Sequence, residues 1–192
     1  MNEPILLIDN YDSFTHNLLH LAEKHYEGKI HLIANDDERL AEAIAKHNII
    51  ILSPGPGLPH EAGKLMEVMP AVLAKKKVLG VCLGHQAIAS YYGAQLFQDK
   101  QVYHGISSPL HLTDHKDSLY EGIPPLFDVA RYHSWMVSEK NLPSQIEITG
   151  KDSAGNIMSY RIKERNIRGI QYHPESILCA YSDAIMKNWL NL

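Results

Sequence analysis

Lys77-Val-Leu-Gly-Val-Cys-Leu-Gly-His-Gln86 is the stretch that decides the fold, because a short apolar run there enters a cysteine flanked by glycines. Residues 77–81 have the pattern of a buried strand, and residues 84–92 have the pattern of a helix. A strand that passes into a helix at Gly-x-Cys-x-Gly has the form of a nucleophile elbow, which exposes a reactive atom at the edge of a sheet. The stretch therefore predicts an α/β fold with the thiol of Cys82 at that edge.

Strand and helix patterns alternate on the amino-terminal side of this stretch. Asp12 or Ser13 can cap the first helix, and Pro70 is expected to kink or divide the last one. Such alternation predicts parallel strand pairing with helices on both faces of the sheet. Strands are predicted at 4–9, 29–33 and 48–53, and helices at 14–22, 38–46 and 61–75.

The carboxyl-terminal half is richer in strands. The chain shows no repeat, no low-complexity tract and no linker, and its 192 residues, 45% of them apolar, suffice for one hydrophobic core. We expect residues 1–192 to form a single α/β domain with an open, mixed, largely parallel central sheet and helices on both faces. Strands are predicted at 95–97, 108–112, 127–131, 145–149, 158–162 and 167–172, and a helix at 182–190.

Composition and charge exclude several classes of function. The formal net charge is -4 and the Lys and Arg residues are scattered, so we expect neither a nucleic-acid partner nor an anionic membrane partner. The first apolar run is short and ends at Asp9, so no secretory signal is predicted, and no segment is long enough to span a bilayer. Cys82 and Cys179 are far apart in a chain without export features, which favours free thiols and a cytoplasmic location.

Histidine spacing does not predict a metal centre. His16 and His20, and likewise His111 and His115, are four residues apart, a spacing that could ligate a metal on a helix. No carboxylate or third ligand accompanies either pair, and His111 falls in a strand pattern. We therefore expect no metal and no cofactor.

Two further motifs accompany Cys82. The helix amino terminus beneath the sulfur stabilises a thiolate, although a buried core cysteine is the simpler interpretation of Cys82 alone. Gln171-Tyr-His-Pro-Glu-Ser176 follows a predicted strand, and residues two apart in extended backbone share a side, so His173 and Glu175 can lie together. They suit a base for Cys82 and a carboxylate that orients its ring, whereas alone they could form an ordinary solvated loop.

Ser53-Pro-Gly-Pro-Gly57 ends another buried strand. Loops at the carboxyl ends of parallel strands line the ligand crevice, and a glycine loop can direct backbone N–H groups at an oxyanion. A simple turn is the alternative interpretation. His104 and His133 also lie near turns, where single histidines are more often structural than catalytic.

Together these motifs resemble the triad-type, or class I, glutamine amidotransferases. The resemblance is greatest to the amidotransferase subunits of anthranilate synthase and 4-amino-4-deoxychorismate synthase, and the motifs run in family order across nearly the whole chain. The matching stretches are Leu7–Phe14, Leu52–Gly57, Gly80–Ala87, Arg131–Ser134 and Gly169–Ile177.

The resemblance implies a role for each matching position. Cys82 matches the nucleophile, His173 its base and Glu175 the orienting acid. The backbone N–H groups of Gly57 and Leu83 match those that form the family's oxyanion hole. The remaining matches are expected to bind the substrate, L-glutamine, partly through its α-amino and α-carboxylate groups: Gly55, Gln86, Ser134 and the backbone of Trp135.

The implied function is a glutaminase subunit that hydrolyses glutamine through a glutamyl-thioester and supplies ammonia to a chorismate-using synthase subunit on a separate chain. Ile106 stands where the family usually has Lys, in a loop near the partner, and Trp135 stands where it usually has Leu. The alternatives are a stand-alone amidase or γ-glutamyl hydrolase, and a non-catalytic regulatory subunit, which would have no need of an intact triad. The product could be anthranilate, aminodeoxychorismate or both.

Overall fold

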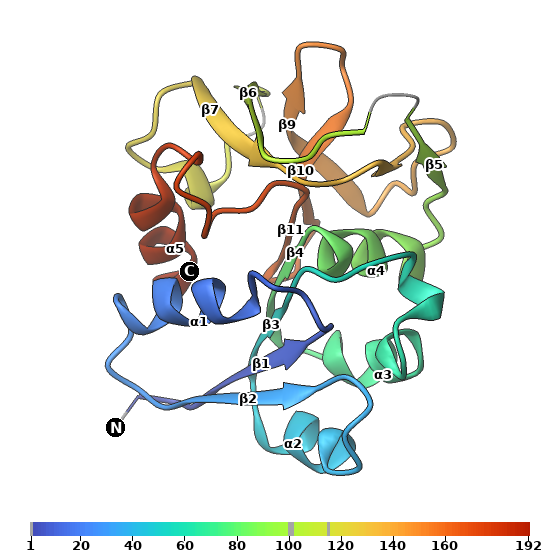
Figure 1. The fold of residues 1–192 in the computed structure, drawn as a ribbon, viewed down its shortest axis with the longest axis vertical. Helices are drawn as coiled ribbons and strands as arrows, with labels where there is room; N and C mark the ends of the chain where they lie inside the picture. Colours follow the sequence, from blue (N-terminus) through green and yellow to red (C-terminus); the bar gives the residue numbers. More distant parts are fainter. Residues whose placement is uncertain (1, 100–101, 115) are drawn as a thin grey trace.

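A computed structural model describes residues 2–99, 102–114 and 116–192. Within these residues, strands and helices alternate up to α4, and strands dominate from there to the last helix (Figure 1). The helices are α1 (Thr15–Glu23), α2 (Leu40–Lys46), α3 (Leu65–Val72), α4 (Leu83–Tyr91) and α5 (Ser182–Leu190), with short 3-10 helices at Pro59–Glu61 and Ser118–Tyr120. The strands are β1 (Ile5–Asp9), β2 (Ile30–Ala34), β3 (Ile49–Leu52), β4 (Lys77–Val81), β5 (Leu96–Gln98), β6 (Ile106–Leu112), β7 (Leu126–Arg131), β8 (Trp135–Val137), β9 (Ile146–Asp152), β10 (Ile157–Ile162) and β11 (Ile167–Ile170).

One mixed sheet organises the molecule. Among the described residues it holds nine strands in the order β2-β1-β3-β4-β11-β10-β9-β6-β7, while β5 and β8 form a separate antiparallel pair. The first five strands in that order pair in parallel, and the remaining neighbours pair antiparallel. The predicted single α/β fold with a mixed sheet is confirmed.

Alternate side chains of the central strands enter two cores, one on each face of the sheet. Leu6 and Ile8 of β1 belong to the core that α2, α3 and α4 cover. Ile5 and Leu7 belong to the core that α1 and α5 cover. All four side chains are fully buried, which explains why a strand buried on both faces is a continuous apolar run. The prediction of helices on both faces is confirmed (Figure 1).

The structure departs from two details of the prediction. Pro70 lies within α3 and does not divide it, because burial of Leu65, Met69 and Val72 holds the helix against the core. The break falls earlier, at residues 62–64, where Gly63 has a φ of +51°. The short strand β8 was not predicted. No helix among the described residues has the length and apolar character needed to cross a bilayer.

Candidate active site

Cys82 occupies a strained turn between β4 and α4. Its backbone has φ 51° and ψ −100°, an uncommon conformation for a residue with a side chain, and it immediately precedes the helix. A Cβ on Gly84 would lie 2.6 Å from the carbonyl oxygen of Leu52 in β3, so only glycine lets the helix approach the sheet this closely. The predicted elbow geometry is therefore present, with the sulfur at the carboxyl end of β4.

A small cavity opens beside the sulfur. Its volume is about 130 Å³, below the roughly 300–1,000 Å³ of pockets for drug-sized ligands, which suits a small metabolite. Of the residues predicted to bind substrate, the structure brings all but Leu83 to its wall. The lining residues are Gly55, Pro56, Gly57, Cys82, Gln86, Tyr132, His133, Ser134 and Trp135.

Leu83 does not line the cavity, but its backbone N–H lies at a helix terminus. Its side chain is buried in the core, but it is the first residue of α4, and the first four backbone N–H groups of a helix lack intrahelical acceptors. Gly57 lines the cavity with a φ of +69°. Asn10 stabilises the start of the glycine loop. Its backbone N–H donates to Ser53 Oγ at 2.8 Å, and its Nδ2 donates to the Ser53 carbonyl at 2.8 Å.

His173 and Glu175 form a buried pair next to Cys82. His173 Nδ1 donates to Glu175 Oε1 at 2.7 Å, and both side chains are almost fully buried. Burial alone would lower the pKa of His173, but Cys82 and Glu175 raise that pKa well above its ordinary value. The second ring nitrogen, Nε2, has no hydrogen-bond partner among the described residues, so it is the atom available to take a proton from the thiol.

Aromatic rings enclose this histidine. The ring of Tyr132 lies 4.9 Å from that of His173, and the ring of Phe14 lies 5.4 Å from it, both edge-on. Phe14 and Tyr132 also contact each other at 4.7 Å. Phe14 immediately precedes α1, so the first sequence motif, Leu7–Phe14, packs against His173.

A hydrogen-bonded chain joins the cavity wall to the sulfur. Gln86 Nε2 donates to the carbonyl oxygen of Trp135 at 2.8 Å and to Gln171 Oε1 at 3.2 Å. Gln171 Nε2 in turn lies 3.6 Å from Cys82 Sγ. The sequence analysis did not single out Gln171. The local signal that could have found it is its place in the predicted strand 167–172, two residues before His173, since alternate residues of a strand share a side.

A buried ion pair supports the loop that carries Ser134 and Trp135. Arg131 Nη1 lies 2.7 Å from Asp152 Oδ2, and the guanidinium stacks 3.5 Å from the ring centre of Tyr103. Arg131 Nε donates to His133 Nε2 at 3.3 Å, so the proton of this imidazole lies on Nδ1, which donates to the Trp135 carbonyl at 3.2 Å. Burial and the Arg131 charge keep the pKa of His133 well below its ordinary value. His133 is thus a neutral structural histidine.

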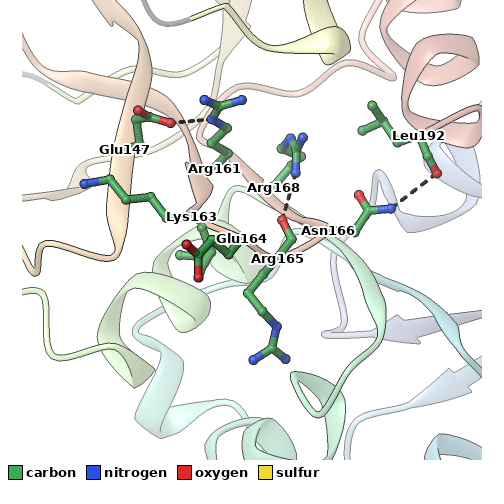
Figure 2. Close-up of a pocket in the computed structure, with 9 residues that line it drawn as sticks. Glu147, Arg161, Lys163, Glu164, Arg165, Asn166, Arg168 and Leu192 are labelled. Atoms are coloured by element: carbon green, nitrogen blue, oxygen red, sulfur yellow. Dashed lines mark hydrogen bonds and ion pairs between the residues drawn. The ribbon is translucent and has the colours of Figure 1, made fainter.

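The larger cavities of the molecule lie elsewhere. One of about 630 Å³ is lined by the turn between β10 and β11, at the opposite end of β11 from the cysteine (Figure 2). Its arginines are engaged with protein groups: Arg161 with Glu147, and Arg168 with Asp117 and the Arg165 carbonyl. None of its lining residues is a cysteine, serine or threonine, so the chemistry points to the smaller cavity.

The described residues contain no cluster of three or more histidine, cysteine, aspartate or glutamate side chains that could hold a metal ion. His20 contacts Glu23 on the exposed face of α1, and His111 lies in β6. His115 lies outside the described residues.

Comparison with known proteins identifies the family. The model for class-I glutamine amidotransferases matches residues 6–192. Anthranilate synthase component 2 of Pseudomonas aeruginosa is 39% identical, over 97% of this chain and 94% of that protein. Aminodeoxychorismate synthase component 2 of Klebsiella aerogenes is 38% identical, over 97% of this chain and 99% of that protein. This chain belongs to the class-I glutamine amidotransferase family.

The fold agrees with solved structures. A glutamine amidotransferase from Thermotoga maritima superposes with a TM-score of 0.71 at 18% identity, covering 100% of this chain and 82% of that one. At this identity the likeness speaks for the fold alone. The structural comparison therefore supports the fold, and the sequence comparisons show the family.

Proposed function

We propose that this chain is a glutaminase subunit in which Cys82, His173 and Glu175 hydrolyse L-glutamine and deliver ammonia to a chorismate-using synthase on a separate chain. The observation that carries the proposal is the strained elbow at Cys82 beside a buried His173–Glu175 pair. An activated thiolate, a base and an orienting carboxylate are the parts that covalent amide hydrolysis requires.

The reaction follows from these positions. His173 takes the thiol proton, and the Cys82 sulfur forms a bond to the carboxamide carbon of glutamine. The backbone N–H groups of Gly57 and Leu83 stabilise the resulting oxyanion. The C–N bond then breaks as His173 returns its proton to the leaving nitrogen, and ammonia departs. Water hydrolyses the glutamyl-thioester, which releases glutamate and restores the thiol.

Substrate binding falls to the wall of the small cavity. Gln86, Ser134 and the backbone of Trp135 hold the α-amino and α-carboxylate groups, while Gly55 lets the chain of glutamine reach the sulfur. Because the Trp135 carbonyl is held by Gln86 and His133, the change from the family's usual leucine leaves the position of this backbone unchanged.

The partner and the setting follow from the relatives. Both sequence relatives are named as component 2 of a synthase, so we assign the acceptor chemistry to a separate component that acts on chorismate in the cytoplasm. The product is anthranilate, aminodeoxychorismate or both, since one amidotransferase subunit can serve two synthases. Nothing in the charge distribution favours a nucleic-acid partner.

Glutaminase assays of the purified chain, with and without a chorismate-using synthase, test the proposal. We expect glutamine hydrolysis that the synthase increases. High activity of the chain alone, unchanged by the synthase, would establish a stand-alone amidase or γ-glutamyl hydrolase. Absence of activity under both conditions would establish a non-catalytic regulatory subunit.

A further inference from the structure

We infer that Gln171 is a positioning residue for the nucleophile: its side-chain amide donates to the Cys82 sulfur, favours the thiolate, and ties that sulfur to the loop that holds glutamine. This inference rests on the proposed function, and it adds a residue to which no role has been assigned above.

The backbone of Gln171 is fixed. It directly follows β11, its side chain is fully buried, and its N–H donates to the Met158 carbonyl at 2.8 Å, which prolongs the pairing of β11 with β10. A buried primary amide must place its donors and its acceptor on partners, because an unpaired polar group costs about 1–3 kcal/mol. The side chain of Gln171 is therefore held in one orientation by what surrounds it.

The hydrogen-bonded chain determines that orientation. The Trp135 carbonyl can only accept, so the Gln86 atom 2.8 Å from it must be the amide nitrogen. The same nitrogen lies 3.2 Å from Gln171, which requires an acceptor, Oε1, at that position. Nε2 of Gln171 is then the atom that faces Cys82 Sγ at 3.6 Å.

An N–H donor aimed at sulfur has a chemical consequence. Hydrogen bonds to a charged acceptor are stronger than those to its neutral form, so this donor favours the thiolate of Cys82 over the thiol. His173 also interacts with this sulfur. Gln171 would thus hold the negative charge in place while His173 carries the proton.

The chain also links charge and substrate. Trp135 lines the glutamine cavity, and its carbonyl accepts from both Gln86 and His133. A shift of the Ser134–Trp135 loop is therefore transmitted through Gln86 and Gln171 to the sulfur by three hydrogen bonds. The alternative is that Gln171 merely fills space in the core.

Two substitutions separate these roles. Gln171→Glu is nearly isosteric and can still accept from Gln86, but it turns a carboxylate toward the sulfur. Gln171→Met removes both hydrogen bonds. Thr149→Val is the matched control, because Thr149 is also fully buried and hydrogen-bonded, to Ser159 Oγ at 2.9 Å, but lies in β9, two strands from β11.

The measurement is the pH dependence of iodoacetamide alkylation, in a Cys179→Ser background that leaves Cys82 as the only thiol. We expect the midpoint to rise by about one pH unit in Gln171→Met and by more in Gln171→Glu, and to stay unchanged in Thr149→Val. With the synthase present, the KM for glutamine should rise in Gln171→Met and stay within about twofold in Gln171→Glu, whose Gln86 contact persists.

Unchanged midpoints in both folded variants would overturn the inference and leave only the packing role. If Gln171→Met does not fold, the isosteric Gln171→Glu decides alone. Failure of the proposed function is recognised separately: the unsubstituted chain would then lack glutaminase activity with its synthase, while the alkylation midpoints would still report on the contact between Gln171 and the sulfur.

Discussion

The two thiols of this chain lie in opposite environments. Cys82 is only 6% exposed but lines the cavity, next to an imidazole and an amide donor. Cys179 lies in the core under α5, and burial raises the pKa of its thiol to about 12. Since only a thiolate reacts as a nucleophile, the difference in environment predicts a difference in reactivity.

We expect glutamine-mimicking electrophiles to inactivate the protein by labelling Cys82 and to leave Cys179 unmodified. Peptide mapping by mass spectrometry after inactivation identifies the labelled residue. Excess L-glutamine should slow the labelling, because both compete for one cavity. A label found mainly on Cys179 would reverse the assignment of the nucleophile.

The resemblance predicts that Ile106 stands where the family usually has lysine, near the partner, in a segment that was expected to be a loop. It opens β6, and 39% of its surface is exposed, which is more than a side chain that fills a packing gap would show. We therefore expect an apolar contact with the synthase at this point, in place of an ion pair that a lysine could form.

In that case Ile106→Lys should weaken the complex by roughly 10- to 1,000-fold, since burying an unpaired ammonium costs on the order of a few kcal/mol. Titration against the same synthase measures the dissociation constants. Leu126→Lys is the control, because Leu126 is exposed and lies near the other end of the β6–β7 hairpin. Equal dissociation constants for Ile106→Lys and the unsubstituted chain would support the packing role.

At the scale of the residue, local sequence patterns pointed to the groups that we propose to react, but not to the side chains that hold those groups. Cys82 and His173 stand in recognisable local patterns. The orientation of the Gln171 side chain, in contrast, depends on its hydrogen bond to Gln86, 85 positions away. Similarly, His133 is defined by the Arg131–Asp152 pair, which joins β7 to β9. Contacts between residues so distant in sequence depend on strand order, which no local pattern states.

The close contact between α4 and β3 depends on one glycine. Replacing glycine by alanine within a helix usually stabilises the helix by about 1 kcal/mol. At Gly84 the new methyl group would lie 2.6 Å from both Cβ and the carbonyl oxygen of Leu52. Overpacking against backbone costs about 1–3 kcal/mol, so the sign of the effect should reverse.

We expect Gly84→Ala to lower the free energy of unfolding by about 1–2 kcal/mol and to reduce glutaminase activity, because the helix and Cys82 must shift together. Denaturant titrations give the free energy. Gly155→Ala is the control for activity: its Cβ would meet nothing within 4 Å, and although its φ of +85° makes alanine cost about 1–2 kcal/mol, glutaminase activity should be retained. An active Gly84→Ala variant of unchanged stability would contradict the close approach.

Elements with strong local signals were predicted well. The helix at 182–190 has the bounds of α5, and the apolar runs of β1, β3 and β4 were identified to within a residue or two. β8 was missed because it spans only Trp135–Val137 and is paired with β5, itself three residues long. Pro70 does not divide α3, because burial of Met69 and Val72 outweighs the lost hydrogen bond.

The molecule as a whole carries buried neutral histidines, which tie its stability to pH. Burial lowers the pKa of His85 to about 3, and burial with the Arg131 charge lowers that of His133 well below its ordinary value. In the unfolded chain these groups take up protons near pH 6.5. The unfolded state therefore binds more protons as the pH falls from 6.5 toward 3, and stability is lost in that window.

We expect each of these histidines to lower the free energy of unfolding by about 1.4 kcal/mol per pH unit below 6.5. His85→Met should reduce the loss between pH 7 and pH 5, as measured by denaturant titration at each pH. His20→Gln, on an exposed face, should leave it unchanged. The raised pKa of His173 acts in the other direction and only above pH 6.5, so it does not enter this comparison. Equal losses in His85→Met and the unsubstituted chain would contradict the burial of a neutral His85.

The proposed division of labour between two chains is a property of the whole assembly. If Cys82 carries all amide chemistry and the synthase carries all chorismate chemistry, ammonia is the only species that passes between them. Added ammonia should then substitute for the ammonia that this subunit releases from glutamine, while the subunit remains part of the complex. The elbow at Cys82 makes the experiment possible, because the backbone there is set by the glycines and not by the sulfur.

We expect Cys82→Ser to reduce glutamine-dependent synthesis by the complex roughly 10³-fold or more, while ammonia-dependent synthesis stays at the level of the unsubstituted complex. A serine hydroxyl has a much higher pKa than a thiol, so beside His173 it is far less ionised at neutral pH, and a site arranged for a thiolate should react with it far more slowly. Cys179→Ser is the control and should retain both activities. Product formation with glutamine or with an ammonium salt, at equal complex concentration, measures the two routes. Near-normal glutamine-dependent synthesis by Cys82→Ser would remove the sulfur from the mechanism, and loss of the ammonia route as well would show that the substitution disrupts the complex rather than the chemistry.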